Sequence, residues 1–178
     1  MEAERYLIAT AQISLAMAGF AGVVAAYRNQ SEAGWGSVER FWLRLLLLNA
    51  ILPFAFSLVG IFILVISPSR TAWQWSSGIA AICLIPYAVM IVRELRELPA
   101  GSLQAAGSGL LVSRSLFGCL IAVCLLQVWN AVTGAAFWPF FAAILALNLG
   151  AIFQFARLVL TSHRPTAIEE SKNISEDA

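Results

Sequence analysis

The sequence predicts an all-α integral membrane protein, a bundle of five transmembrane helices. The first observation is composition: 60% of the 178 residues are hydrophobic and 12% are charged. The charged share is about half of the ~25% that soluble domains usually contain. The second is that the chain contains uncharged apolar runs as long as the ~20 residues that a helix needs to cross a ~30 Å hydrocarbon core. The chain is therefore expected to be a single membrane domain.

The spans follow from the apolar runs and from the turns between them. The first run, YLIATAQISLAMAGFAGVVAAY, contains no charge, and a short polar stretch follows it. Residues 115–156 also contain no charge, which is too long for one span and suits two. Gly134 and Pro139 within TGAAFWP supply the break between those two. We therefore expect a bundle over residues 1–160 with spans at about 6–27, 41–66, 73–92, 110–132 and 137–160, and a disordered cytoplasmic tail at 161–178.

The distribution of positive charges supports an odd number of spans and predicts their orientation. Five spans place nine basic residues on one side and two on the other. Cytoplasmic loops carry an excess of Lys and Arg, so we expect the N-terminus outside and the C-terminus in the cytoplasm. An aromatic belt is then expected at the outer interface, formed by Trp73, Trp75, Trp129 and Trp138. The inner group is Arg28, Arg40, Arg44, Arg93, Arg96, Arg114, Arg157, Arg164 and Lys172, against Arg5 and Arg70 outside.

The first span is rich in small residues, which predicts close helix packing. Ser14, Ala18, Gly22 and Ala26 repeat every four residues, and Gly19 lies beside Gly22. Such a face lets a neighbouring backbone approach closely. We expect this helix to be surrounded by others, and Gly22→Leu to cost ~1–3 kcal/mol by overpacking. The neighbour is either another span of the same chain or a second copy.

The polar side chains within the spans are neutral, and they have two interpretations. Ordered from outside to inside, Gln12, Asn148, Asn49 and Gln154 lie at successive depths. The favoured interpretation is that these amides join helices, because an interhelical hydrogen bond stabilises a bundle by ~0.6–2 kcal/mol. The alternative is that they line a polar path for a small solute or ion.

Residues that carry chemistry are sparse in the spans. No Asp, Glu, Lys or His lies within a predicted span; the single His is His163, and the single Asp is Asp177 in the tail. Proton-coupled transporters and intramembrane proteases rely on ionisable residues near the midplane. The three cysteines are predicted to be small buried thiols rather than metal ligands. The sequence therefore predicts no enzyme, no catalytic residue, no metal and no cofactor, and the lack of a basic patch argues against nucleic acid as a partner.

Three stretches resemble a group of small uncharacterised bacterial membrane proteins. They are AQISLAMAGFAGVVAAYR, ERFWLRLLLLNAILPFAFSLV and NLGAIFQFARLVL. The first span of that group reads A-x-I-S-L-A-x-A-G-F-x-G-V-V, and its last span ends in Gln-Phe-x-Arg-Leu. The resemblance implies a bacterial origin and an inner-membrane location, and it implies no activity. The matching positions are Ser14, Gly19, Phe20, Gly22, the stretch from Arg40 to Arg44, Pro53, Gln154 and Arg157.

Two functional hypotheses follow. The first is a non-enzymatic protein that works by packing in the lipid bilayer, as a structural, sensory or accessory subunit. We expect such a subunit to form a homo-oligomer or to associate with other membrane subunits. The second is a channel or facilitator for a small neutral solute or ion, lined by amide side chains.

Overall fold

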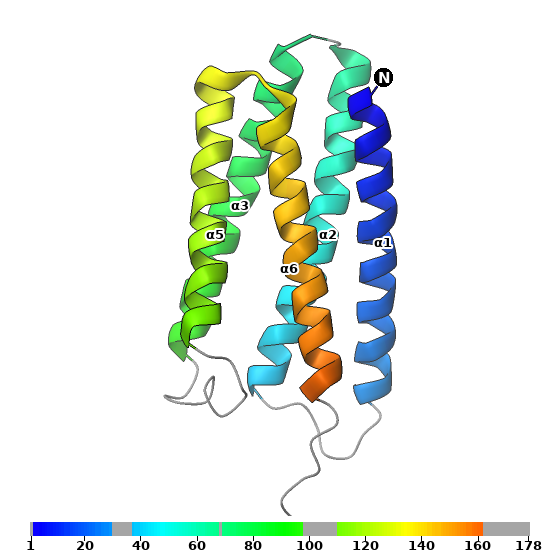
Figure 1. The fold of residues 1–178 in the computed structure, drawn as a ribbon, viewed down its shortest axis with the longest axis vertical. Helices are drawn as coiled ribbons and strands as arrows, with labels where there is room; N and C mark the ends of the chain where they lie inside the picture. The colour runs from blue at the N-terminus through cyan, green and yellow to red at the C-terminus, as the bar shows by residue number, and fades with distance from the viewer. Residues whose placement is uncertain (1, 30–36, 68, 98–109, 162–178) are drawn as a thin grey trace, which may run out of the picture.

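The computed structural model describes residues 2–29, 37–67, 69–97 and 110–161, and five long helices account for nearly all of them (Figure 1). Each of the five is long and apolar enough to cross a membrane. This confirms the predicted all-α membrane bundle. The predicted disordered tail lies outside the described residues apart from Thr161. The helices are α1 (Glu2–Asn29), α2 (Ser37–Ile66), α3 (Thr71–Glu97), α5 (Leu110–Trp129) and α6 (Phe137–Thr161), with a π-helical turn η1 (Asn130–Gly134) between the last two.

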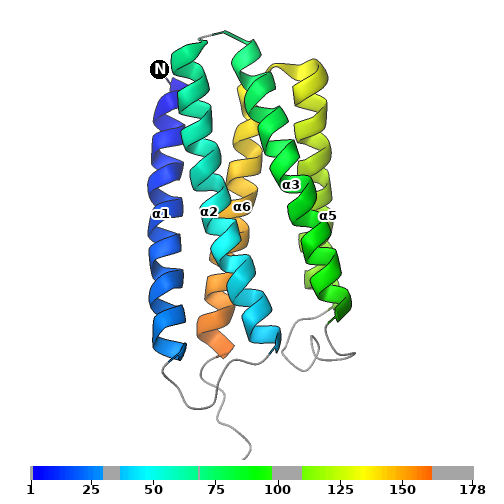
Figure 2. The ribbon, with the colours of Figure 1, turned by 180° about the vertical axis from the view of Figure 1, so that it is seen from behind.

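The helices run alternately up and down, so that the start of α1 and the end of α6 lie at opposite ends (Figures 1 and 2). We call the end at which α1 begins the upper end, and the other the lower end. The described arginines divide between these ends as the sequence predicts. Arg5 and Arg70 lie at the upper end, while Arg40, Arg44, Arg93, Arg96 and Arg157 lie toward the lower end.

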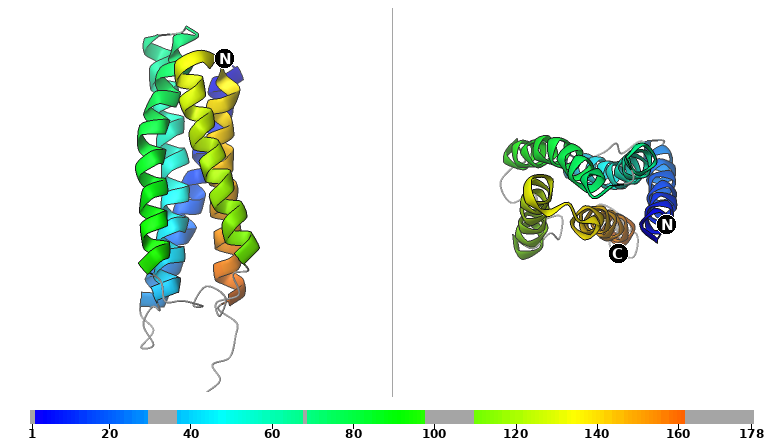
Figure 3. Two further views of the ribbon diagram at one scale, coloured as in Figure 1. Left: turned by 90° about the vertical axis from the view of Figure 1, so that its left-hand side faces the viewer. Right: turned by 90° about the horizontal axis from the view of Figure 1, so that it is seen from above.

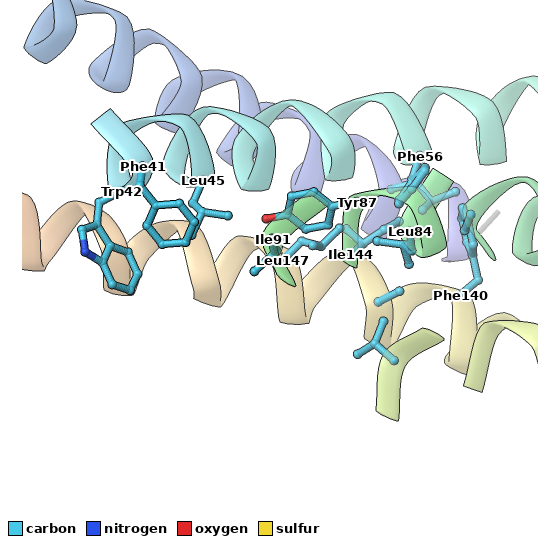
Figure 4. Packing of buried hydrophobic residues seen from close by; sticks show 14 residues of the cluster. Phe41, Trp42, Leu45, Phe56, Leu84, Tyr87, Ile91, Phe140, Ile144 and Leu147 are labelled. Atoms are coloured by element: carbon cyan, nitrogen blue, oxygen red, sulfur yellow. The ribbon is translucent and has the colours of Figure 1, made fainter. Parts of the chain in front are cut away.

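The bundle is built around the contact between α2 and α6. Viewed from above, α1 lies at one edge, and α3 and α5 lie at the opposite side (Figure 3). The contacts of α1 are chiefly with α2 and, to a smaller extent, with α6. The apolar core runs along the bundle between these helices, from Phe41 and Trp42 at the lower end to Phe56 and Phe140 nearer the upper end (Figure 4).

The chain turns sharply between α5 and α6, at the break that the sequence predicts. The side chain of Asn130 closes this corner: its amide nitrogen donates to the Ala136 carbonyl oxygen at 2.9 Å, and its Oδ1 accepts from the Ala136 N–H at 3.0 Å. Ala135 has a φ of 47°, which is uncommon for a residue other than glycine. A Cβ at Gly134 would lie 2.4 Å from Oδ1 of Asn130, so only glycine fits there. The same Asn130 amide donates to the Ser77 hydroxyl on α3 at 2.7 Å, which ties the corner to the bundle.

Aromatic side chains gather at the upper end. Trp73 on α3 lies with its ring centroid 4.8 Å from that of Phe137, and Trp129 and Trp138 lie 6.3 Å apart across the corner. Their placement near one end of the helices is that of an interfacial belt.

Candidate functional site

The first polar cluster joins α1 to α2 and α6. The Ser14 hydroxyl lies 2.9 Å from Oδ1 of Asn148 and 2.7 Å from the carbonyl oxygen of Thr10, so two acceptors share its single proton. The hydroxyls of Thr10 and Ser57 lie 3.1 Å apart. All four side chains are buried. Because polar groups in an apolar interior need partners, these bonds hold three helices together. We call Thr10, Ser14, Ser57 and Asn148 the closed cluster.

The second polar cluster joins α2, α3 and α6. Asn49 accepts a hydrogen bond from the Tyr87 hydroxyl at 2.7 Å and donates one from Nδ2 to Oε1 of Gln154 at 3.2 Å. All three side chains are buried. A Cβ at Gly150 would lie 3.1 Å from Nδ2 of Asn49, so glycine at this position lets α6 approach the amide. We call Asn49, Tyr87 and Gln154 the open cluster.

The open cluster has a spare hydrogen-bond donor. Gln154 uses its Oε1 to accept from Asn49, and its Nε2 has no acceptor among the residues that the structure describes. Gln154 is nevertheless 95% buried, since its relative exposure is 5%. Nε2 is not among the polar atoms that the protein covers completely, so this donor borders accessible space.

A cavity of about 100 Å³ lies beside the open cluster, in the lower half of the bundle. Figure 4 shows part of its wall, with the Tyr87 hydroxyl pointing toward the end of the core that holds Phe41, Trp42 and Leu45. Among the described residues that line this cavity there is no Asp, Glu, Lys or Arg. The lining comprises Asn49, Tyr87 and Gln154 together with Phe41, Trp42, Leu45, Ile91, Leu95, Leu116, Phe117, Cys119, Leu120, Val123, Ala146, Leu147 and Gly150.

Charged groups lie at the lower edge of the cavity. The guanidinium carbon of Arg157 is 4.1 Å from the centroid of the Trp42 ring, within the range of a cation–π contact. Trp42 is 8% exposed, and its indole N–H is buried without an acceptor in the described part of the chain. Arg44 on α2 forms an ion pair with Glu94 on α3.

The structure does not bring the four amides of the alternative polar path together. Gln12 is exposed on the outer surface of α1, away from the interior of the bundle. Asn148 is held in the closed cluster, whereas Asn49 and Gln154 belong to the open cluster. The four side chains therefore do not line one route. Depth along a helix follows from the sequence, whereas the direction in which each side chain points is decided by the tertiary structure.

The predicted packing face of α1 is only partly correct. Ser14 is buried and Ala18 is half-buried against α2 and α6. Gly19, Gly22 and Ala26 are exposed, and a Cβ built at either glycine meets nothing within 4 Å. Within the described part of the chain, α1 therefore lies at an edge of the bundle and is not surrounded by other helices. The inward face is instead formed by Leu7, Thr10, Ala11, Ser14 and Ala21.

Sequence reasoning missed three residues around the cavity. Tyr87 reads as one more aromatic residue of an apolar span, and Trp42 as an interfacial anchor. Glu94 reads as part of a solvated helix end, yet it pairs with Arg44 of the neighbouring helix. For Trp42 the available signal was its spacing of seven residues from Asn49, because residues seven apart lie on one face of a helix.

No group of three or more His, Cys, Asp or Glu side chains that could hold a metal ion occurs among the described residues. Comparisons of the chain with protein-family models, with characterised proteins and with solved structures give no match.

Proposed function

We propose that this chain is a non-enzymatic, multi-pass protein of the bacterial inner membrane that works by helix packing, as a structural, sensory or accessory subunit. We further propose that it assembles into a homo-oligomer through α1. The observation that carries this is Gln12, a neutral amide on the outer surface of the bundle. It lies six residues beyond Tyr6, where the expected span begins, and so about 9 Å inside the upper edge of a ~30 Å hydrocarbon core.

A second feature of α1 supports docking at the same face. From Gln12 to Ala26, the residues that recur at alternating spacings of four and three lie on one face of α1. All of them are exposed, and most of them are small. Small residues with one polar side chain are typical of helix–helix interfaces in membranes, because backbones approach closely and the polar groups of two helices bond each other. The face consists of Gln12, Ala16, Gly19, Val23 and Ala26.

The interior of the bundle favours packing over transport. In the closed cluster, Ser14 meets Asn148 and Thr10 meets Ser57 between helices, and the Asn148 amide nitrogen donates to the Ile144 carbonyl oxygen of its own helix. The channel hypothesis depends on a continuous row of amides, and Gln12 does not take part in such a row. The favoured role is therefore one in which the bundle holds a shape and presents α1 to a partner.

We also propose that the upper end faces the cell exterior and the lower end faces the cytoplasm. The support is the number of arginines at the lower end, which suits the cytoplasmic side. A Ser69→Cys variant in a Cys83→Ala, Cys119→Ala, Cys124→Ala background tests this. We expect a membrane-impermeant maleimide to label it in intact cells. Labelling only after the membrane is opened would reverse the orientation.

Sedimentation equilibrium of the full chain in a nonionic detergent tests the oligomer. We expect reversible association, weakened by about three- to thirtyfold in Gln12→Leu, because one interhelical hydrogen bond stabilises by ~0.6–2 kcal/mol. Gln74→Leu on α3 is the matched control and should associate like the wild type. A monomer at every concentration, or equal association of wild type and Gln12→Leu, would contradict the proposal.

A further inference from the structure

We propose that the cavity in the lower half of the bundle binds a neutral amphiphile whose polar end carries a carbonyl oxygen. That oxygen accepts a hydrogen bond from the Gln154 amide, and the adjoining carbon chain fills the apolar part of the cavity. Such a site goes beyond the proposed packing role. It does not require an oligomer, because all the residues that form it lie within one chain.

The open cluster leaves one donor at the cavity. The Tyr87 hydroxyl donates to Oδ1 of Asn49, and Nδ2 of Asn49 donates to Oε1 of Gln154, so both amide oxygens already accept a hydrogen bond. Nε2 of Gln154 has no acceptor among the described residues, and this side chain lines the cavity while it is 5% exposed. A ligand with an acceptor oxygen completes this series of hydrogen bonds, whereas a pure hydrocarbon leaves the donor unmet.

The charges around the cavity favour a neutral ligand. Among the described residues that line it there is no Asp, Glu, Lys or Arg, and the polar groups of the open cluster are neutral amides and a hydroxyl. At the lower edge, Arg44 pairs with Glu94, and Arg157 lies over the Trp42 ring and outside the cavity lining. A charged head group would lose its hydration here without a countercharge in contact, which is costly in an apolar interior.

The rest of the wall suits a short piece of a carbon chain. Leu45, Ile91, Leu120 and Val123 contribute aliphatic surface to a cavity of about 100 Å³. An apolar cavity of about 150 Å³ holds one benzene molecule, so this cavity has room for a carbonyl group and a few adjoining carbon atoms. Cys119 on α5 both lines the cavity and is exposed, so the remainder of a longer chain can leave the bundle at that residue.

Alkylation of Cys119 by N-ethylmaleimide in the full chain reports whether the cavity is occupied. In a Cys83→Ala, Cys124→Ala variant in nonionic detergent, Cys119 is the remaining thiol. The control is a Cys119→Ala, Cys124→Ala variant, in which the exposed Cys83 lies outside the cavity and reports changes in the micelle alone. We expect 2-decanone to slow the Cys119 reaction severalfold and saturably, relative to Cys83. An unchanged ratio of the two rates up to the solubility limit of the ketone would overturn the proposal.

Matched probes test the ligand class in the same assay. They are 2-decanone, decane, decanesulfonate and decyltrimethylammonium, compared by their mole fraction in the micelle so that partitioning into detergent does not enter. We expect half-maximal protection by the ketone at a mole fraction about three- to tenfold lower than by decane, which is the effect of one neutral hydrogen bond. The two charged probes should be at least tenfold weaker than the ketone. Equal potency of decane, or of either charged probe, would overturn the assignment.

Variants then locate the site. Gln154→Met keeps the length of the side chain and removes the donor, so the preference for 2-decanone over decane should disappear. Gln12→Met carries the same change at the outer surface and should keep the preference. Ala146→Phe fills the cavity and should abolish protection by every probe, whereas Leu149→Phe on the exposed side of the same helix should not. A preference retained in Gln154→Met, or protection retained in Ala146→Phe, would overturn the proposal.

Two further measurements keep the outcomes separate. Circular dichroism and gel filtration check that each variant folds, and Gln154→Met, which changes the side-chain volume little, decides the result if Ala146→Phe does not fold. Sedimentation equilibrium on the same samples gives the oligomeric state. A monomer in which the ketone protects Cys119 would contradict the oligomer and leave this site standing, and an oligomer without protection would do the reverse.

Discussion

Asn148 and Gln154 lie six residues apart on the same helix, and they have opposite surroundings. Asn148 meets the Ser14 hydroxyl of α1 in the closed cluster. Gln154 accepts from Asn49 in the open cluster and keeps a donor beside a cavity. The difference comes from what lies opposite: α1 packs directly against α2 and α6, whereas α3 and α5 leave space on the other side in the lower half. Asn148 therefore joins α6 to α1, whereas Gln154 on the same helix borders a cavity.

The largest effect is expected where one side chain serves two partners. Asn49→Leu leaves the buried Tyr87 hydroxyl without its acceptor and Gln154 Oε1 without its donor. Each of the two stranded buried groups costs ~1–3 kcal/mol, so we expect the free energy of unfolding to fall by about 2–6 kcal/mol. Unfolding by sodium dodecyl sulfate in mixed micelles, followed by circular dichroism, measures this. Tyr87→Phe, which removes one partner only, should cost less, and a cost below about 0.5 kcal/mol in Asn49→Leu would contradict the described network.

The closed cluster should respond more weakly. Asn148→Leu removes the bond to Ser14, but the Ser14 hydroxyl keeps the Thr10 carbonyl oxygen as its acceptor. We therefore expect a loss of about 1 kcal/mol, close to a typical interhelical bond in a membrane protein. A double-mutant cycle with Ser14→Ala in the same unfolding assay gives the coupling energy, expected at about 0.6 kcal/mol. If Asn148→Leu cost more than Asn49→Leu, the contrast between the two clusters would be lost.

The ion pair at the lower end should contribute less again. Arg44 is largely exposed, so Glu94→Gln should lower the free energy of unfolding by about 0.5 kcal/mol. Raising the salt concentration should reduce that difference, because the charges are then screened. The test is the same unfolding assay at two ionic strengths; a difference that does not change with salt would indicate that packing, not charge, explains the loss.

The smallest effect on the folded chain is expected at Gly22. A Cβ there meets nothing within 4 Å, so Gly22→Leu should change the free energy of unfolding by less than about 0.5 kcal/mol. Ser14→Leu on the inward face of the same helix is the contrast, and it should be strongly destabilising because that position is fully buried. Equal losses in the two variants would show that both faces of α1 pack within the chain.

Much of the candidate site was visible in the sequence as a set of polar residues, but not as a site. Asn49 and Gln154 were recognised as buried amides, and the structure brings them into contact. No sequence pattern around Tyr87 marks it as the third member of the open cluster. The cavity depends on the distance between neighbouring helices, which a single sequence does not show. Gln12 was assigned to the interior because its depth resembled that of the other amides, whereas helix rotation turns it outward.

The sequence by itself determined that the chain forms five helices long and apolar enough to cross a membrane, and that positive charge collects at one end. Those properties depend on the length and composition of single segments, and each segment carries them without reference to its neighbours. Only the tertiary structure decided that α1 lies at an edge, that Ser14 faces inward while Gly22 faces outward, and that a cavity borders Gln154. The physical reason is that an apolar helix without a polar stripe has no preferred inward face of its own, so its rotation is set by the surfaces it meets.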